Sequence, residues 1–566
     1  MLFIKDSFKE INPLNNIRKM HTNIRGDILS GVTVAIIALP LALAFGSMSG
    51  LGPISGIWGA IVGGIIGGIF GGCLVGVSGP TAPKAAQIAA FMSAFVIGSS
   101  NEPDLIAAFS IIFISGLILI AISMLKISRF IHYIPYPVIA GFMCGIGIIV
   151  ILTQINAFFG LEAEKNIHGV FHNFKYIIQN INLQALYVSI PSLIILFSWT
   201  YFEKKINFLV KIPSPLVALV IGTAIAYFMN LDIPYIGDKM GTNQEEIFTL
   251  YWPDLSRLSE FIFPAFALAG LAVLDSLLSC KVADTMIGKK HSSDRETFGQ
   301  GMANMAAGFL GGVTTATATM RTVANIKFGG KTPLASIVHG LTLLAILLGL
   351  GFLVASIPNA CLAAILFKVG IDILDYRILP VLKKIPRADL FIFIVVLFIT
   401  VYQDLMIAVA IGVALAFISN INEIKSTFNS NYNHKLIPFS ESDFVKGLKN
   451  NKTLVDLPVS ILQPHGPLFF GSMESLMNFY SSSKRHKMLI IDMDYVTMID
   501  LSGIYALEDF IKNLRIKKIE VIVYNTSNSI KETFKKINFT KNFDEDYCKD
   551  SRELVISLVS KNFNIN

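Results

Sequence analysis

Two short stretches decide the fold: GCLVGVSGPTAP at 72–83 and GGVTTATATM at 311–320. Each is rich in small residues and leads into an unusual apolar segment, 80–97 after the first and 319–328 after the second. The second segment is too short to cross a bilayer alone, because a spanning helix needs about twenty residues. Short or interrupted segments at matching positions of two halves indicate a transporter binding site. Close helix packing by small residues, which is common in membranes, is the alternative interpretation.

Apolar segments surround both stretches and recur along most of the chain. We identify fourteen, at 28–48, 54–71, 80–97, 105–125, 131–155, 183–202, 213–230, 262–280, 297–312, 319–328, 334–355, 360–379, 387–403 and 405–421. Seven fall in each half, and an odd number per half inverts the second half relative to the first. The prediction is therefore a polytopic α-helical membrane protein with 14 transmembrane segments as a 7+7 inverted repeat. The transport domain covers 28–421, with repeats at 28–230 and 262–421.

Composition agrees with this class and excludes others. The 566 residues are 53% hydrophobic and 15% charged, with a mean hydropathy of +0.62. Soluble domains carry about a quarter charged residues. We find no nucleotide-binding loop and no catalytic triad, so we expect no enzyme, and no cofactor beyond a coupling ion. The net charge of +7 is assigned to cytoplasmic loops rather than to nucleic-acid binding, because no zinc-type Cys/His spacing is present.

The distribution of basic residues predicts the orientation. Residues 1–27 form a cytoplasmic N-terminal segment, and most basic residues between segments then fall in inner loops. Those in outer loops are only Lys165, Lys175, Lys239 and Arg257. Positive residues favour the cytoplasmic side. We therefore expect a multi-pass protein of a bacterial inner membrane with both termini in the cytoplasm.

The composition changes after the last apolar segment. Residues 422–440 are polar and predict a linker, and 441–562 alternate strand and helix patterns, with KMLIIDMDYV and IEVIVYN as buried strands. This predicts a small cytoplasmic α/β domain. Ser502 follows a strand and begins a helix, where it would be exposed and a phosphate would be tolerated. A plain helix cap is the alternative.

Three ionisable residues lie within apolar segments, where such residues are functional candidates by default. They are Lys84, Asp275 and Arg321. If two half-helices meet at their N-termini, their free N–H groups form an anion cradle, to which Thr81, Thr317 and Thr319 add hydroxyl donors. Two positive charges and one negative charge sum to about +1, which suits an anion. Snorkelling of Lys84 and structural pairing of Arg321 with Asp275 are the alternatives.

Ser279 lies four residues after Asp275 and shares its helical face. The two oxygens, with half-helix carbonyls, predict a small Na⁺ site as an alternative to the structural role of Asp275. The histidines, His339 among them, show no metal-ligand spacing.

At this point the chain resembles the SulP family of anion transporters. The matching stretches are IRGDILSGVTVAIIALPLALAFGSMSGLGPISGIWGAIVGG at 24–64, VLDSLLSCKVADTMIGKK within 273–334 and LFKVGIDILDYRIL at 366–379. The motifs ALPLALAFG and DSLLS are especially similar to those of the Na⁺-coupled bicarbonate branch. Residues 441–562 resemble a STAS domain.

The resemblance implies core and gate domains, an elevator motion, a homodimer and cytoplasmic regulators that act through the STAS domain. It also implies residue roles. Thr81, Ala82, Ala318, Thr319 and Met320 would contact the anion, Asp275 and Ser279 would match the Na⁺ site, and Ser502 would match a phosphate acceptor. From their charges, Lys84 and Arg321 join the predicted substrate-binding set.

Lys84 and Arg321 depart from the bicarbonate branch, which lacks basic residues at both positions. Sulfate-type members commonly carry the arginine, with Glu at the Asp275 position and proton coupling. The expected function is secondary active transport of bicarbonate or sulfate, coupled to Na⁺ or H⁺. Alternatives are an uncoupled anion channel or exchanger, a dicarboxylate transporter or a nucleobase permease of this fold, and a membrane-tethered signalling protein.

Overall fold

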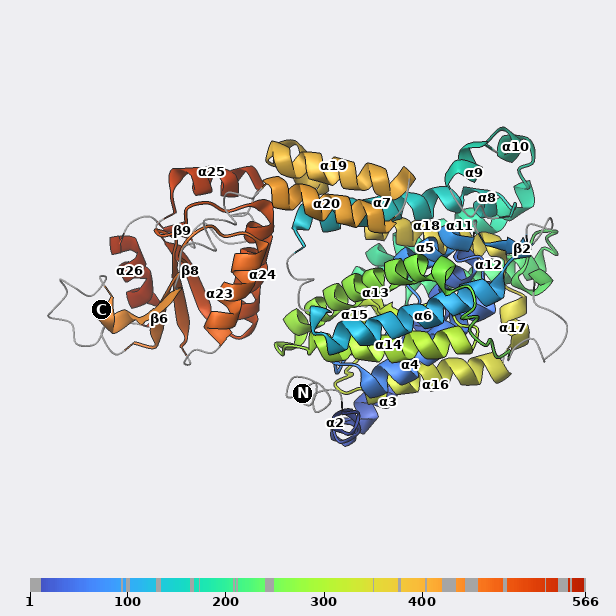
Figure 1. Cartoon of the computed structure of the whole chain (residues 1–566), viewed down its shortest axis with the longest axis horizontal. Helices are drawn as coiled ribbons and strands as arrows, with labels where there is room; N and C mark the ends of the chain where they lie inside the picture. The colour runs from blue at the N-terminus through green and yellow to red at the C-terminus, as the bar shows by residue number, and fades with distance from the viewer. Residues whose placement is uncertain are drawn as a thin grey trace. The chain divides into compact units, whose positions relative to one another are not determined.

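The chain divides into two compact units, which are described separately (Figure 1). Unit 1 comprises residues 1–131, 143–374 and 397–407, and unit 2 comprises 132–142, 375–396 and 408–566. The computed structural model describes residues 12–92, 95–97, 102–128, 134–162, 167–172, 174–206, 209, 212–239, 249–349, 351–374, 378–402, 405–419, 434–442, 457–481, 486–524, 526–537, 548–549 and 552–563.

Each predicted apolar segment contains a helix. In the first half these are α3 (Ile24–Met48), α4 (Pro53–Phe70), α5 (Ala82–Met92), α6 (Leu105–Met124), α7 (Tyr136–Thr153), α11 (Leu183–Lys205) and α12 (Ser214–Phe228). In the second half they are α13 (Leu258–Ile287), α14 (Ser293–Phe309), α15 (Thr319–Lys327), α16 (Leu334–Gly349), α18 (Asn359–Ile373), α19 (Arg387–Tyr402) and α20 (Leu405–Ser419). Among the described residues, six helices are long and apolar enough to cross a membrane. Helix is the expected form there, since lipid offers no partners to backbone polar groups.

The helices of unit 1 form two packed groups. One contains α3, α4, α6, α13, α14 and α16, and α11, α12 and α18 form the other. Small residues allow the closest approach within the first group. A Cβ on Gly116 of α6 would lie 2.5 Å from the backbone nitrogen of Met305 in α14, so only glycine fits at this crossing. Such contacts are the usual means of packing helices in a membrane.

The two small-residue stretches meet in the first group. Strand β1 (Ser78–Gly79) pairs antiparallel with β4 (Ala316–Thr317), with Ser78 opposite Thr317. Each strand leads directly into a short helix, β1 into α5 and β4 into α15. Antiparallel strands send the two helices away in opposite directions, so their N-termini meet at the strand pair. The first of these helices is shorter than predicted and ends at Met92, before strand β2 at Val96–Ile97.

Unit 2 contains a five-stranded sheet in the order β5-β6-β7-β8-β9. The strands are β5 (Lys435–Pro438), β6 (Val459–Gln463), β7 (Met488–Asp492), β8 (Glu520–Tyr524) and β9 (Cys548–Lys549). The first pair is antiparallel and the others are parallel. The domain's helices are α23 (Phe470–Ser481), α24 (Leu501–Ile516), α25 (Asn528–Ile537) and α26 (Arg552–Asn562). The predicted strands are thus β7 and β8.

Strand β5 lies inside the segment 422–440 that the sequence assigned to a linker. The polar residues around β5 do not show the buried pattern of a central strand. The reason is that β5 lies at the edge of the sheet and its two end residues are exposed. The linker residues 422–433 lie outside the described part of the chain.

Candidate functional site

The β1–β4 pair brings together residues that are more than 200 positions apart in the sequence. The Ala318 backbone N–H, at the N-cap of α15, donates to the Val77 carbonyl at 3.0 Å. The Thr317 N–H donates to Ser276 Oγ at 3.2 Å, which fastens β4 to α13. Thr81 and Ala82, where α5 begins, are both buried. The predicted meeting of two half-helices is therefore present, with their free N–H groups at one place.

Arg321 is the most unusual side chain of this site. It is 1% exposed, and Nε, Nη1 and Nη2 have no hydrogen-bond partner in the described part of the chain. The guanidinium lies against β1, where a Cβ on Gly79 would approach Nη1 to 1.8 Å. Buried polar groups are nearly always paired. Five unpaired N–H donors on one buried cation therefore indicate a position for an anion.

Asp275 is the countercharge. It lies on α13 within the field of both Lys84 and Arg321. The Thr81 hydroxyl lies beside the Asp275 carboxylate without meeting hydrogen-bond geometry, and both Thr81 Oγ1 and Asp275 Oδ2 are without partners among the described residues. The expected structural pair of Arg321 and Asp275 is thus a long-range interaction that leaves bonding positions of both groups unfilled.

Lys84 is fully buried and donates to the Thr315 carbonyl beside β4. Its amine is engaged by the protein backbone, so it acts on the site through its charge. Snorkelling toward an interface, one of the alternatives, is wrong because the amine points into the protein.

The remaining predicted residues divide into two sets. Ser279 is buried, and its hydroxyl lies 2.7 Å from Thr319 Oγ1 at the first turn of α15. Ala318 is half-buried and Thr319 is exposed. Met320, which precedes Arg321 in α15, is 51% exposed, whereas Arg321 is buried. The structure thus gathers Thr81, Ala82, Asp275, Ser279, Thr319 and Arg321 around the strand pair and places the Met320 side chain outside it.

A buried polar network behind the strand pair is a functional feature that the sequence analysis missed. Glu296 of α14 accepts hydrogen bonds from the Gly72 and Cys73 N–H groups, both at 2.8 Å, and from the Thr317 hydroxyl. Gln300 donates to Glu296 Oε1 at 2.9 Å and to Ser78 Oγ at 2.7 Å. This network holds both strands. The spacing of Glu296, Gln300 and Asn304, one helical turn apart, was the available signal.

A second missed residue is His339 of α16, which is fully buried. Within the described residues, both its ring nitrogens are unpartnered, and the charge acting on it is that of Arg321. Metal-ligand spacing was the wrong criterion, because the relevant neighbour is a cation on another helix.

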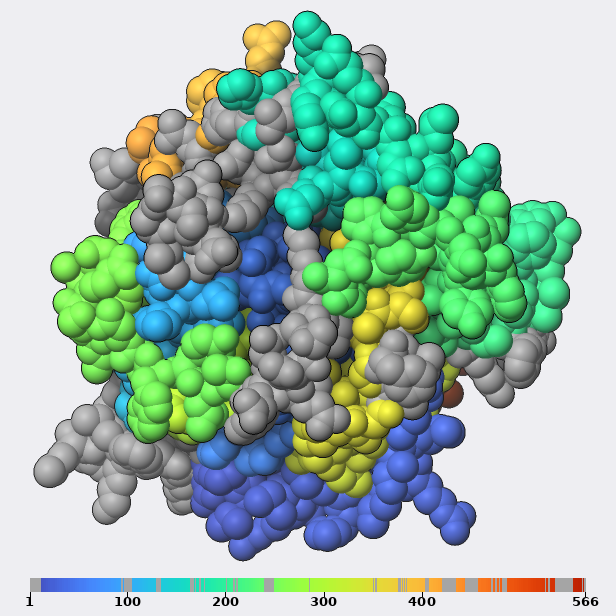
Figure 2. Space-filling model, turned by 90° about the vertical axis from the view of Figure 1, so that its right-hand side faces the viewer, coloured from blue at the N-terminus to red at the C-terminus, as the bar shows by residue number. Residues whose placement is uncertain are grey.

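A cavity of about 920 Å³ opens between the two helix groups of unit 1. It is lined by residues from the α3–α4 connection, α8 (Ile155–Phe158), the 232–238 segment and the start of α18. Figure 2 looks onto this face, where teal, green and yellow segments surround a recessed blue surface. Glu162, Asp232 and Asp238 lie on its exposed rim.

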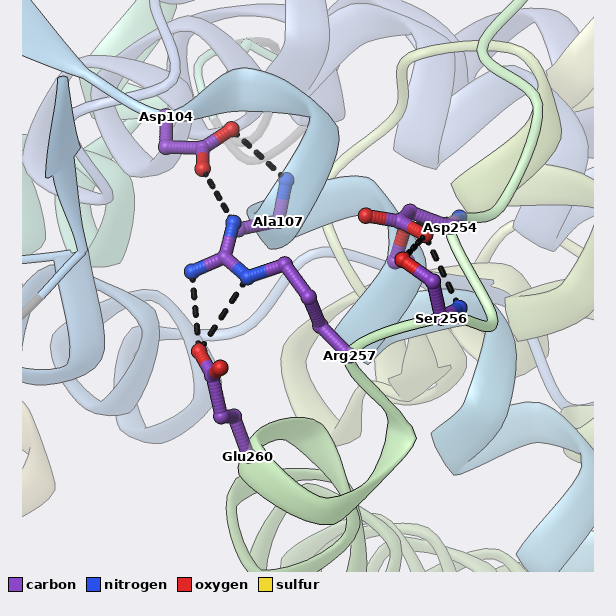
Figure 3. Close-up of polar contacts among 7 residues, drawn as sticks. Asp104, Ala107, Asp254, Ser256, Arg257 and Glu260 are labelled. Carbon is purple, nitrogen blue, oxygen red and sulfur yellow. Dashed lines mark hydrogen bonds and ion pairs between the residues drawn. The ribbon is translucent and has the colours of Figure 1, made fainter.

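Arg257, which the sequence analysis predicts in an outer loop, is paired through all three guanidinium nitrogens (Figure 3). Its Nη1 donates to Asp104 Oδ2 at 2.8 Å, while Nε and Nη2 both contact Glu260 Oε2. Asp104 also caps α6 by accepting from the Ala107 N–H at 3.0 Å. This cluster ties the start of α13 to the start of α6.

In unit 2, Ser502 contradicts one expectation. We predicted an exposed hydroxyl, but Ser502 is 2% exposed and accepts a hydrogen bond from the Tyr136 N–H at 2.9 Å. The neighbouring Asp500 caps α24 by accepting from the Gly503 N–H at 2.6 Å. Burial, with a further contribution from the Asp389 carboxylate, raises the pKa of Asp500 to about 7.

Comparison with known proteins gives consistent results. Residues 24–396 match the model of the sulfate permease family, and residues 452–553 match the STAS domain. The chain is 33% identical over 545 residues to the bicarbonate transporter BicA of a Picosynechococcus strain, with 94% of each chain covered. It is 30% identical to a Bacillus subtilis protein that bears the name of a sulfate transporter, YvdB, covering 90% of this chain and 93% of that one.

Two solved structures share the architecture. The transmembrane domain of a cyanobacterial BicA has a TM-score of 0.61 at 35% identity and covers 68% of this chain and 97% of its own. The overall structure of SLC26A9 has a TM-score of 0.65 at 18% identity, covers 99% of this chain and 94% of its own, and shows the fold alone.

Proposed function

The chain belongs to the sulfate permease family and carries a STAS domain, and on that premise we propose that it is a secondary active transporter of a small inorganic anion, bicarbonate or sulfate. The family is one of transporters and not of enzymes. We assign the protein to a bacterial inner membrane with both termini in the cytoplasm. The relatives named for bicarbonate and for sulfate support both substrates.

The buried guanidinium of Arg321, which has no hydrogen-bond partner among the described residues, is the observation that carries this proposal. An unpaired cation in a low-dielectric interior is costly unless a ligand neutralises it. Two helix N-termini at the same place supply further N–H donors, as in many oxyanion sites. The anion binds at Arg321 and Thr81, with Ala82, Ala318 and Thr319 contributing from the starts of the two short helices. Lys84, beside β4, attracts the anion through its positive charge without contacting it.

Transport proceeds by an elevator-type motion. Helix α13 belongs to the first helix group, and α5, α15 and both strands of the site pack against helices of that group. Glycines allow these helices to approach one another closely. The second group, α11, α12 and α18, serves as the gate. Movement of the first group past the second exposes an unchanged site to either side of the membrane. A cavity between the groups supports this division.

Asp275 determines which cation is transported together with the anion. With a monovalent anion, Asp275, Ser279 and half-helix carbonyls bind Na⁺, a hard cation that takes oxygen ligands. With a divalent anion, Asp275 remains the countercharge of Arg321 and Lys84, and a proton accompanies the substrate. No other cofactor is proposed. The protein forms a homodimer in the lipid bilayer. Cytoplasmic regulators act on it through the STAS domain.

The decisive experiment is uptake into proteoliposomes that contain the full chain. Labelled bicarbonate and labelled sulfate are each followed with and without an inward Na⁺ gradient. Na⁺-stimulated bicarbonate uptake supports the sodium site, and Na⁺-independent sulfate uptake that rises with external acid supports the proton-coupled mode. No saturable uptake of either anion contradicts the proposal, and currents far above carrier turnover favour an anion channel.

A further inference from the structure

The segment that precedes α3 is short and ordered, and the transport mechanism above does not use it. It contains α2 (Leu14–Ile17) and the short 3₁₀ helix η1 (Met20–Thr22), and α3 begins at Ile24. Helix α2 packs on α4, near the start of α3 (Figure 1). Since α3 is long and apolar enough to span a membrane, this segment lies where the chain enters the bilayer.

Asn16 fastens the segment to the rest of the protein. Its side chain is 1% exposed, on the side of α2 that faces α4. The Asn16 Nδ2 group donates to the carbonyls of Gly68, Ile69 and Gly71 at 3.0, 3.1 and 3.0 Å. These carbonyls lie at the C-terminal end of α4, where backbone acceptors have no partner within the helix. A four-residue helix has little stability of its own, so these bonds hold the segment in place.

The other side of α2 is apolar and exposed. Leu14 is 51% exposed and Ile17 is 42% exposed, and their spacing of three residues places them on one side of the helix. The exposed apolar surface continues at the start of α3 with Ile24 and Ile28. An apolar face that continues onto a membrane span fits the boundary between acyl chains and headgroups.

Basic side chains surround this apolar face. Arg18 and Lys19 follow α2, Arg25 lies in the first turn of α3, and all three are exposed. Lys331, also exposed, lies nearby because its backbone N–H donates to Asp27 Oδ1 at 2.7 Å. Asp27 is the only acidic residue of the sequence 12–29, and it is buried. None of the four basic side chains has an ion pair or hydrogen bond with the residues that the structure describes.

This combination of side chains matches the chemistry of an acidic phospholipid. Arg18 lies four residues after Leu14, so a cation and the apolar residues share one side of the segment. Acyl chains would cover Leu14 and Ile17, and the phosphate would approach Arg18 and Lys19. Basic residues beside a membrane span attract anionic headgroups. A soluble acidic protein would match the charges but would not match an apolar face that continues into a span.

We propose that residues 12–25, together with Lys331, form a binding surface for an acidic phospholipid. The inference goes beyond the proposed function, because it does not depend on which anion is carried or on how transport is coupled. Through Asn16 the bound lipid fastens the end of α4 to the membrane surface. Helix α4 belongs to the helix group against which the anion site packs, so the lipid acts on the part of the protein that holds the site.

The test measures lipid binding by the purified full chain in a neutral detergent. Short-chain phosphatidylglycerol or phosphatidylcholine is titrated at low ionic strength, and binding is read from the rise in unfolding temperature. Phosphatidylglycerol should raise this temperature and phosphatidylcholine should not. Glycerol phosphate, which has the charge without acyl chains, should not compete. Arg18→Gln combined with Lys19→Gln should weaken phosphatidylglycerol binding about 25-fold, since each cation near a headgroup contributes about fivefold.

Lys204→Gln combined with Lys205→Gln is the matched control, because these lysines form an exposed pair at the end of α11, in the other helix group. It should leave binding unchanged. Asn16→Ala keeps every charge and removes the bonds to α4, so it should also weaken binding.

Four results would each overturn the inference: equal losses in the two double variants, unchanged binding in Asn16→Ala, equal binding of the two lipids, and competition by glycerol phosphate. Both double variants change only exposed side chains, so they should fold. Uptake into proteoliposomes tests the transport proposal separately, and either proposal can fail while the other stands.

Discussion

Arg257 and Arg321 present the same side chain in two opposite settings. Arg257 is 38% exposed and has carboxylate partners on two sides, Asp104 and Glu260, with the Phe261 ring 5.0 Å away. Arg321 is 1% exposed and has no hydrogen-bond partner within the described ranges. Exposed ion pairs contribute at most about 1 kcal/mol each to stability. An unpaired buried cation lowers stability by more.

The difference separates charges that stabilise the fold from charges that are left available to a ligand. The cluster of Arg257, Asp104 and Glu260 completes its own pairing and connects two helix ends, so it needs no ligand. The inner site keeps donors and acceptors open at Arg321, Thr81 and Asp275. Stability given up at a buried position is explained if a ligand supplies the missing contacts. The following predictions test this contrast.

Arg321→Ala should produce the largest effect. Loss of the guanidinium should weaken anion binding about 100-fold, because charge-assisted bonds worth about 3 kcal/mol in total disappear. The ligand-free variant should unfold at a higher temperature than the wild type, because an unpaired buried cation is removed. Binding is measured by calorimetry and unfolding by a thermal ramp in detergent, without the anion.

Arg257→Ala is the matched control. Its two ion pairs are lost, so stability should fall by at most about 2 kcal/mol and the unfolding temperature should fall slightly. Anion affinity should stay unchanged. Equal losses of affinity in the two variants would show that Arg321 is not part of the anion site.

Glu296→Gln should produce the next largest effect, a loss of stability. Its carboxylate accepts from two backbone N–H groups, Gln300 and the Thr317 hydroxyl. An amide NH₂ would face donors instead, so we expect a loss of about 2 kcal/mol. Glu260→Gln makes the same change in the exposed Arg257 cluster and should lower stability by less than about 1 kcal/mol. Similar unfolding temperatures for the two variants would contradict the role of the buried network.

The sequence picks out residues of the candidate site most readily where charged groups occur in apolar segments. Lys84, Asp275 and Arg321 stood out because charges in apolar segments are rare, and the structure gathers them around the predicted half-helix junction. Glu296 did not stand out, since it lies in the polar start of α14, just before the predicted apolar segment 297–312. Its backbone partners, Gly72 and Cys73, lie over 200 positions away in sequence.

The prediction that Ser502 is exposed is wrong for the same reason, because its partner is distant in the sequence. The start of its helix was predicted correctly, although the N-cap is Asp500 and not Ser502. Its burial depends on Tyr136, which lies 366 positions earlier in the sequence. Local patterns predict helices and caps well, and they do not identify the surface that covers them. The edge strand β5 was missed because only its pairing with β6 distinguishes it from a linker.

Asp500→Asn should change the pH dependence of unit 2. The pKa of Asp500 is raised to about 7 by burial and by the Asp389 carboxylate, so the folded protein holds this proton more tightly than the unfolded chain. Stability therefore falls as pH rises from about 4 to about 7 and is constant above that range. Asparagine keeps the helix cap and removes the slope. Hydrogen exchange of α24 in the full chain between pH 5 and 8 measures the effect, and an equal slope in both proteins would contradict it.

Ser502→Ala should have the smallest effect. It removes the acceptor of the Tyr136 N–H and leaves the Tyr136–Tyr505 ring contact, whose centroids are 4.5 Å apart, in place. One neutral hydrogen bond contributes about 1 kcal/mol, so the Tyr136 amide should exchange about fivefold faster. Ser502→Asp should accelerate exchange more than alanine does, because a third carboxylate joins Asp389 and Asp500, whose charges already interact. Equal exchange rates in the two variants would mean that charge at this position is tolerated, as the exposed serine of the sequence prediction required.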